Sequence, residues 1–230
     1  MKPRIYGIIP ARGGSKGVPK KNIQFIAGKP LIYYTIIAGL GSRYINKLIV
    51  STDDDKIFQV AESFGAIAWK RPENISGDDS PTIDTVLHVL EQCNIKENEP
   101  EIVVLLQPTS PLRTSSDIDS ALELFMKNDC DSVISVVQTD HPPFWNMILE
   151  GKYLKSLMGQ KYFTMRRQEL PVTYIPNGAI FIASTQTLKI QHTFYGQKTI
   201  PYIMSTERSI DIDSKFDLYI VEEIMRKGEE

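Results

Sequence analysis

A glycine-rich, cationic segment near the start of the chain could bind phosphate groups. Residues 10–17 read PARGGSKG and residues 20–22 read KKN. Glycines let a backbone approach an anion closely with its amides pointing inward. The spacing matches neither the Walker A motif nor the GxGxxG fingerprint of dinucleotide-binding proteins. A solvated basic turn is the alternative, but turn glycines rarely coincide with so much positive charge, so we predict a triphosphate or pyrophosphate site. Its cations are Arg12, Lys16, Lys20 and Lys21.

Two aspartates near the end of the chain could hold a divalent cation. Residues 209–213 read SIDID, and in a strand Asp211 and Asp213 would share one face while the isoleucines face the core. Adjacent carboxylates repel one another unless a cation lies between them, and Mg²⁺ prefers oxygen ligands. The alternative is a surface pair at the start of a helix near Ser214, with Asp213 or Ser214 as the capping residue.

Two further features carry weaker signals. Gln107 directly follows an apolar run and begins the segment QPTSP at residues 107–111, where its amide could bind a hydroxyl-rich ligand. Arg166 and Arg167 form a doublet whose guanidinium groups could clamp a carboxylate or a phosphate. A pair of solvated charges is the default interpretation of such a doublet.

Strands and helices that could position these residues alternate along residues 1–140. Apolar runs typical of parallel strands covered on both faces lie at 5–9, 48–50, 66–69, 102–106 and 133–137. Amphipathic helical spacing occurs at 57–64, 83–90 and 118–125. Ser80-Pro81 should start the second of these helices and Ser116 should cap the third. This order predicts an α/β fold with a Rossmann-like, doubly wound, mainly parallel sheet. Ligands of such sheets bind beyond the carboxyl ends of the strands, so one crevice should lie among the loops after Ile9, Val50, Lys70 and Leu106.

The pattern changes over residues 139–176. This stretch carries His141-Pro142-Pro143, several aromatic residues and methionines, and short alternating runs that favour a hairpin arm. Exposed aromatic and methionine side chains would suit a subunit contact, whereas a long loop folded over its own domain is the alternative. A strand at 178–183 returns to the sheet, and Phe216, Ile220 and Ile224 indicate a last helix. We therefore expect one domain over 1–230 with 139–176 inserted as an arm.

The composition excludes several classes of protein. Lys and Arg total 26 against 28 for Asp and Glu, a net charge of -2, unlike a protein that binds nucleic acid by neutralising phosphates. No apolar run approaches the roughly 20 residues of a membrane span, and the first one is too short for a signal peptide. The two cysteines, Cys93 and Cys130, fit a reducing compartment. We expect a soluble, cytoplasmic protein with no nucleic-acid or membrane partner.

Taken together, the motifs resemble the acylneuraminate cytidylyltransferase family of sugar nucleotidyltransferases. The matching segments follow the order of the family over nearly the whole chain. They are ARGGSKG at 11–17 with Lys21-Asn22, STD at 51–53, RP at 71–72, QPTSP at 107–111, PNGA at 176–179 and SIDID at 209–213.

The resemblance implies a role for each matching residue. The nucleotide CTP would be bound by Ala11, Arg12, Gly13, Ser15, Lys16, Lys21, Asn22, Arg71, Ser80 and Thr82. A sugar would be bound by Gln107, Arg166, Arg167 and Phe181. Residues 139–176 would form a dimerisation arm that carries Arg166 or Arg167 into the partner's active site in a homodimer. Asp211 and Asp213 would hold Mg²⁺. The catalytic residues would be Arg12, Lys21, Arg167 and Asp211.

The implied reaction transfers CMP from CTP to the anomeric hydroxyl of a nonulosonic acid, N-acetylneuraminate or a relative such as legionaminate, and releases pyrophosphate for surface-glycan biosynthesis. Some members have a basic residue near positions 141–144, and this chain has none there, which leaves the partner of the sugar carboxylate open. Three alternatives remain: a cytidylyltransferase for pseudaminate or 3-deoxy-octulosonate, a nicotinamide-dependent oxidoreductase on the same sheet, and a nucleotide sensor without catalysis.

Overall fold

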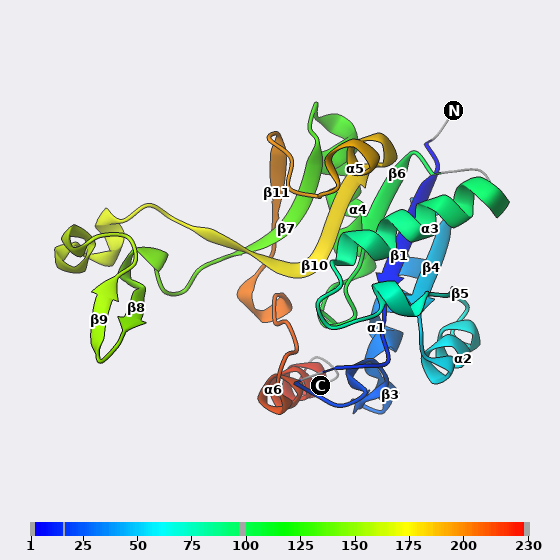
Figure 1. Cartoon of the computed structure of the whole chain (residues 1–230), viewed down its shortest axis with the longest axis horizontal. Helices are drawn as coiled ribbons and strands as arrows, with labels where there is room; N and C mark the ends of the chain where they lie inside the picture. The colour runs from blue at the N-terminus through cyan, green and yellow to red at the C-terminus, as the bar shows by residue number, and fades with distance from the viewer. Residues whose placement is uncertain (1–2, 16, 97–99, 228–230) are drawn as a thin grey trace.

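A seven-stranded sheet forms the centre of the computed structural model, which describes residues 3–15, 17–96 and 100–227 (Figure 1). Its strand order is β11-β7-β10-β6-β1-β4-β5. The strands are β1 (Ile5–Pro10), β4 (Lys47–Thr52), β5 (Ile67–Lys70), β6 (Ile102–Leu105), β7 (Ser132–Gln138), β10 (Tyr174–Ser184) and β11 (Thr199–Ile203). Two small hairpins lie outside this sheet, formed by β2 (Phe25–Ile26) with β3 (Lys29–Pro30) and by β8 (Met147–Glu150) with β9 (Tyr153–Ser156).

The sheet is mainly parallel, as the sequence predicts. The five apolar runs predicted as parallel strands are β1, β4, β5, β6 and β7, and β11 adds a further parallel strand beside β7. Only β10, among the strands of this described sheet, runs antiparallel to its neighbours β6 and β7. It follows the 139–176 segment directly, without the helical crossover that a parallel connection needs.

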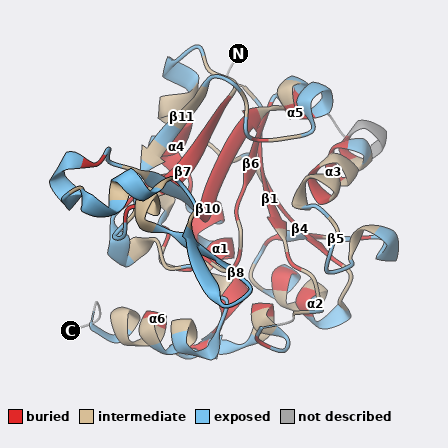
Figure 2. Ribbon diagram, turned by 60° about the vertical axis from the view of Figure 1, so that its left-hand side comes forward, coloured by how far each residue is buried: buried red, intermediate tan, exposed pale blue. Residues whose placement is uncertain are grey.

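Helices cover both faces of the sheet. The helices are α1 (Leu31–Leu40), α2 (Asp55–Ser63), α3 (Thr82–Lys96), α4 (Ser115–Lys127), α5 (Thr185–Gln191) and α6 (Lys215–Lys227). One core cluster packs α1, α2 and α4 against the strands, and a second packs α3 and α5 against the opposite face. Figure 2 shows the strands buried between these layers. Of the helices that the structure describes, none is long and apolar enough to cross a membrane.

Two helix starts differ in how well the sequence predicts them. Helix α3 begins at Thr82, directly after the predicted Ser80-Pro81. The prediction that Ser116 caps the next helix is wrong, because α4 begins at Ser115 and its capping residue is Thr114. The Thr114 hydroxyl accepts a hydrogen bond from the Asp117 amide at 3.2 Å, while the Asp117 carboxylate accepts one from the Thr114 amide at 2.9 Å. Such a reciprocal pair satisfies two backbone donors at once.

Residues 139–176 form a hairpin arm that extends from β7 and β10 away from the sheet (Figure 1). The arm contains the β8–β9 hairpin and short 3-10 turns at Pro143–Trp145, Gln160–Thr164 and Arg167–Glu169. Most of its residues are exposed (Figure 2). The β8–β9 hairpin agrees with the predicted hairpin rather than with a loop folded back over its own domain, whereas the subunit contact stays a prediction.

The segment 209–213 is not a strand, which corrects the expectation from its alternating pattern. It is an irregular stretch fixed at several points. The Ile212 amide donates to the Thr109 carbonyl at 2.9 Å, and its side chain is fully buried in a small cluster with Ile26, Leu31 and Val221. Ser214 caps α6, and its hydroxyl accepts a hydrogen bond from the Asp217 amide at 3.3 Å. Even without a strand, both aspartates still lie on one side of the segment.

Candidate active site

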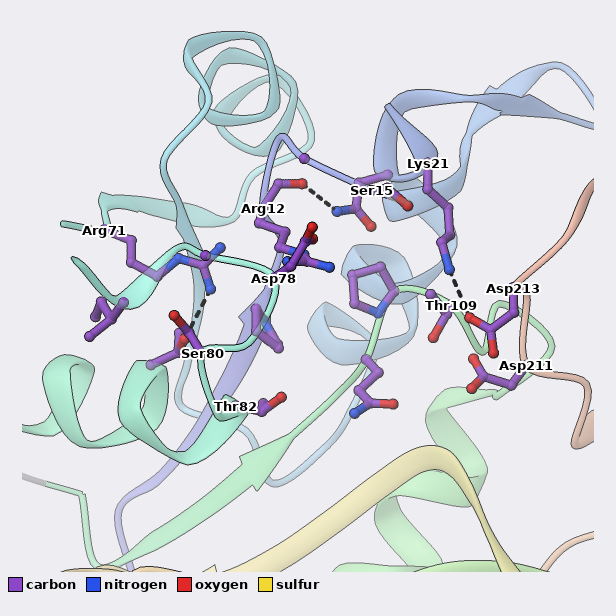
Figure 3. A pocket seen from close by; sticks show the side chains of 18 residues that line it. Arg12, Ser15, Lys21, Arg71, Asp78, Ser80, Thr82, Thr109, Asp211 and Asp213 are labelled. Carbon is purple, nitrogen blue, oxygen red and sulfur yellow. Dashed lines mark hydrogen bonds and ion pairs between the residues drawn. The ribbon is translucent and has the colours of Figure 1, made fainter. Parts of the chain in front are cut away.

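A cleft of about 310 Å³ lies beyond the carboxyl ends of β1, β5 and β6 (Figure 3). This is where ligands of doubly wound sheets bind. Asp211 and Asp213 lie together at one end of the cleft, Arg71 and Ser80 at the other, and Arg12 between them (Figure 3). The predicted site residues that line it are Arg12, Ser15, Lys21, Asn22, Arg71, Ser80, Thr82, Gln107, Asp211 and Asp213.

The glycine-rich loop after β1 is held in place by the loop after β4. The Gly13 amide donates to the Asp53 carboxylate at 3.0 Å, and a Cβ at Gly13 would lie 2.8 Å from the Asp54 Cβ. The Asn22 side chain donates to the Arg12 carbonyl at 2.9 Å and so links the two ends of the loop. Ala11 is fully buried, so it shapes the loop together with Gly13 without lining the cleft. Lys16 lies outside the described residues.

Lys21 joins this loop to the acidic segment. Its ammonium group donates to the Ile212 carbonyl at 2.6 Å and to the Asp213 carboxylate at 3.0 Å. Gly17 also approaches this segment, because a Cβ there would lie 2.2 Å from the Asp213 carbonyl oxygen. A larger residue at position 17 would therefore separate the two segments. The contact places a cation that can bind phosphate directly beside the two carboxylates.

Burial raises the pKa of the Asp211 carboxyl. A hydrogen bond with Thr109 acts in the opposite direction, and the nearby charge of Asp213 raises the pKa further. Asp213 itself is open to solvent, with 80% of its side chain exposed. Two neighbouring carboxylates repel one another, so the pair favours a cation beside it.

Arg71 lies buried at the opposite end of the cleft. Its guanidinium group donates to the Thr85 hydroxyl at 2.9 Å and to the Asp53 carboxylate at 3.4 Å. Burial lowers the pKa of Arg71, and the charge of Asp53 opposes that effect. Asp53 thereby orients both Arg71 and the Gly13 amide. The hydroxyl-bearing residues Ser80 and Thr82 line the cleft beside Arg71 (Figure 3).

The Gln107 side chain lies against Gly178 of β10 at the cleft. Gly178 has a positive φ of 76°, and a Cβ there would lie 2.7 Å from the Gln107 side-chain oxygen and 3.6 Å from a carboxylate oxygen of Asp211. The buried Arg113 links the Gln107 loop to β10. Its guanidinium group donates to the carbonyls of Gln107 at 3.2 Å and Ala179 at 2.7 Å.

Three predicted sugar contacts lie elsewhere in this chain. Arg166 and Arg167 lie on the arm, which extends away from the sheet (Figure 1). Phe181 is in β10 with only 7% of its surface exposed, and its ring packs 5.8 Å from that of Phe194 in the core. It therefore lies in the core rather than on the cleft wall. The alternation of β10 directs this side chain into the core cluster below α3 and α5.

Some cleft residues escaped the sequence analysis. Asp78 and Thr85 line the cleft, and Arg113 supports it, yet none belongs to a pattern with a chemical signature. The one available signal for Arg113 is its place two residues after the QPTSP segment, and burial cannot be predicted from that. Gly178 stands within the PNGA segment, but its approach to Gln107 is a contact between residues 71 positions apart in the sequence, which the segment itself does not reveal.

The mainly parallel sheet and its polar cleft define an α/β protein of the doubly wound type, with a candidate ligand site at the carboxyl ends of its strands. Residues 6–219 match the cytidylyltransferase family, and the chain belongs to that family. It is 37% identical over 230 residues to the N-acylneuraminate cytidylyltransferase of Escherichia coli O18:K1:H7, with 99% of this chain and 53% of that protein covered. It is also 37% identical over 231 residues to the CMP-N,N'-diacetyllegionaminic acid synthase of Legionella pneumophila, with 99% of this chain and 98% of that protein covered.

The chain thus spans about half the length of the E. coli relative and nearly all of the Legionella one. Among solved structures, CMP:2-keto-3-deoxy-manno-octonic acid synthetase complexed with CTP matches with a TM-score of 0.73. That match covers 98% of this chain and 99% of the other at 17% sequence identity, so it shows a shared fold.

Replacing Gly178 by Ala should damage the cleft, whereas Gly151→Ala should not. Both glycines have a positive φ, so each alanine costs about 1 kcal/mol of strain in the folded state. Only the alanine at 178 also collides with Gln107, because nothing lies within 4 Å of a Cβ at Gly151. We expect turnover to fall about a hundredfold in Gly178→Ala, as it does when a reacting group is misplaced by about 1 Å. Steady-state kinetics and thermal unfolding of both variants test this, and equal turnover in the two would contradict it.

Proposed function

We propose that this protein transfers CMP from CTP to the anomeric hydroxyl of a nonulosonic acid, N-acetylneuraminate or a relative such as legionaminate, and releases pyrophosphate. One observation carries the proposal: in a member of the cytidylyltransferase family, a single cleft gathers Arg12 and Lys21 of the glycine-rich segment and the two carboxylates. The names of the E. coli and Legionella relatives support a nonulosonic acid as the acceptor. We further propose that the reaction takes place in the cytoplasm and serves surface-glycan biosynthesis.

Family membership favours this function over the oxidoreductase, which the missing GxGxxG motif already disfavours. Pseudaminate and 3-deoxy-octulosonate remain alternative acceptors within the same reaction. The resemblance to the octonic acid synthetase is one of fold and does not decide between the acceptors.

The cleft suggests how the chain would carry out the transfer. The cytidine would lie at the Arg71 end, near Ser80 and Thr82, and the phosphates would lie along the glycine-rich loop. The acceptor hydroxyl would attack the α-phosphate in line, from the side of Gln107. Phosphoryl transfers of this kind are accelerated mainly by positioning and by charge stabilisation. Arg12 and Lys21 would stabilise the charge that develops on the phosphates and on the leaving pyrophosphate.

The acidic end of the cleft fits Mg²⁺ as a cofactor. Mg²⁺ is commonly bound by one or two carboxylates, with substrate phosphates and waters completing its octahedral shell. Asp211 and Asp213 provide two carboxylates, and no group of three or more metal-ligating side chains is found among the described residues. When bound, the ion would supply charge neutralisation to the phosphates and acidity to the acceptor hydroxyl. Lys21, bonded to Asp213, would direct its charge to the same phosphates.

We also propose that the arm makes the protein a homodimer. Eight large apolar side chains of the arm are 49% to 71% exposed, an unusual concentration on a slender hairpin. They are Met147, Leu149, Tyr153, Leu154, Leu157, Met158, Val172 and Ile175. In such a dimer Arg166 or Arg167 would reach the partner's cleft, where a guanidinium group could bind the carboxylate of the sugar acid.

Pyrophosphate release tests the reaction directly. The purified protein is incubated with CTP, Mg²⁺ and one keto-sugar acid at a time: N-acetylneuraminate, legionaminate, pseudaminate or 3-deoxy-octulosonate. We expect release with N-acetylneuraminate or legionaminate, and a CMP-sugar in equal amount. Release with 3-deoxy-octulosonate alone would replace the proposed acceptor, and CTP binding with no release from any acid would favour a sensor.

Replacing Asp211 by Ala should abolish turnover while leaving CTP binding largely intact. The variant loses one of the two proposed Mg²⁺ ligands, but it also loses a negative charge that repels the nucleotide phosphates. We expect a loss of at least about a thousandfold in kcat, the scale of removing a principal electrostatic contributor. Kinetics and calorimetric titration with CTP test it. Asp129→Asn, at an exposed carboxylate in the loop after α4, serves as control and should keep full turnover. Near-normal rates in Asp211→Ala would refute the metal assignment.

A charge on the arm should separate the subunits. Leu154 is 66% exposed on β9, and an aspartate there would place an unpaired charge inside the proposed interface. Light scattering should show a monomer for Leu154→Asp and a dimer for the unmodified chain. Ile190→Asp, at a 70% exposed site on α5, introduces the same charge away from the arm and should stay dimeric. A monomeric unmodified chain would exclude the dimer.

A further inference from the structure

Arg12 already has an anionic partner from its own chain. Its Nη1 atom lies 2.6 Å from a carboxylate oxygen of Asp78, and the two side chains meet in the middle of the cleft (Figure 3). Both line the cleft, and both remain accessible, with 31% of the Arg12 side chain and 37% of the Asp78 side chain exposed. A ligand entering the cleft therefore reaches this ion pair.

The pair joins two loops whose bases are fixed independently. Arg12 belongs to the glycine-rich loop, which hydrogen bonds from Gly13 and Asn22 hold in place. Asp78 belongs to the connection between β5 and α3, which starts at the buried Arg71 and turns at Gly77, whose carbonyl accepts from the Ser80 amide at 3.2 Å. Since neither loop depends on the ion pair for its anchoring, the pair can break without unfolding either of them.

The charges of the cleft show why the pair matters for binding. Among the described residues, three cations line the cleft, namely Arg12, Lys21 and Arg71, and three carboxylates face them, namely Asp78, Asp211 and Asp213. Lys21 is bonded to Asp213, and Arg71 is bonded to Asp53. Each cation that could bind a phosphate group is thus already in contact with a carboxylate.

A phosphate group and Asp78 compete for the same donor. A phosphate oxygen that accepts from the same Nη1–H donor would lie where the Asp78 carboxylate oxygen lies now, and two anions beside one guanidinium group repel each other. Phosphates form strong bidentate bonds with arginine, so a triphosphate can displace the carboxylate. The displacement lowers the net affinity, because part of the new interaction replaces one that already existed.

We infer that Asp78 is an affinity-setting residue of the nucleotide site, which competes with the phosphates of the nucleotide and with pyrophosphate for Arg12. This inference rests on the proposed function, since it assigns Arg12 to phosphate binding. The competition weakens the binding of every ligand that uses Arg12 and favours release of the product pyrophosphate.

Calorimetric titration of Asp78→Asn with CTP and with inorganic pyrophosphate tests the inference. Removing a partly exposed ion pair of this kind should tighten binding of both ligands about fivefold. Glu73→Gln is the matched control, because it removes one negative charge from the same loop at an exposed residue outside the cleft lining. We expect its affinities to stay within about twofold of those of the unmodified chain, the limit for screened surface charges.

A double-mutant cycle with Arg12→Gln separates competition from simple repulsion. If Asp78 acts through Arg12, Asp78→Asn should bring no gain in the Arg12→Gln background. A gain that persists there would mean that Asp78 repels the phosphates directly, and weaker binding in Asp78→Asn would mean that Asp78 positions Arg12 for the nucleotide. Either result overturns the inference. Absence of CTP and pyrophosphate binding by the unmodified chain would instead overturn the proposed function.

Discussion

The contact between Lys21 and the acidic segment is the interaction on which the cleft depends. It joins residues 191 positions apart in the sequence, since the Lys21 ammonium donates to the Ile212 carbonyl. Gly17 permits the contact by lacking a side chain where the Asp213 carbonyl approaches. With these segments together, Arg12 and Lys21 of the first segment and the carboxylates of the last one line a single cleft. If a side chain at position 17 pushed the two segments apart, the cations and the carboxylates would lie on separate surfaces and could not contact the same ligand.

The contact with Lys21 requires that residues 209–213 stay in one position, although this segment has no regular secondary structure. Arg208, just before the segment, donates to both carboxylate oxygens of the buried Asp117 at 2.6 and 2.7 Å. Asn177 donates to the Ser209 hydroxyl at 2.9 Å, and Ile212 is buried. A buried carboxylate is stable only when fully paired, and Asp117 also accepts hydrogen bonds from Thr114 and Tyr202. Rigidity here comes from side chains of α4 and β10, so the rest of the fold determines where the carboxylates lie.

Sequence reasoning succeeded where local composition decides the structure. Buried parallel strands read as continuous apolar runs, and the loop of glycines and cations after the first strand lies at the cleft, where the doubly wound sheet places it. It failed where distant contacts decide. Helix α1 is apolar on most sides, so its sequence lacks the amphipathic spacing from which other helices are predicted. Phe181 has the right type for a sugar contact, but its place in β10 turns it into the core. The strand expected at 209–213 is replaced by hydrogen bonds to Thr109 and Asn177 that no spacing encodes.

The pairing of cations with carboxylates throughout the cleft also bears on how such a site folds. Three like charges converging on a small volume would repel one another in the folded chain, and the cost grows as burial excludes water. Placing Asp53 beside Arg71, Asp78 beside Arg12 and Asp213 beside Lys21 removes that cost before any ligand binds. The consequence is that a polyanionic ligand must exchange partners within the cleft instead of filling an open positive surface. The affinity for such a ligand therefore depends on the difference in free energy between the ion pairs that form and those that break. A carboxylate paired with a cleft cation can change that affinity as much as the cation itself.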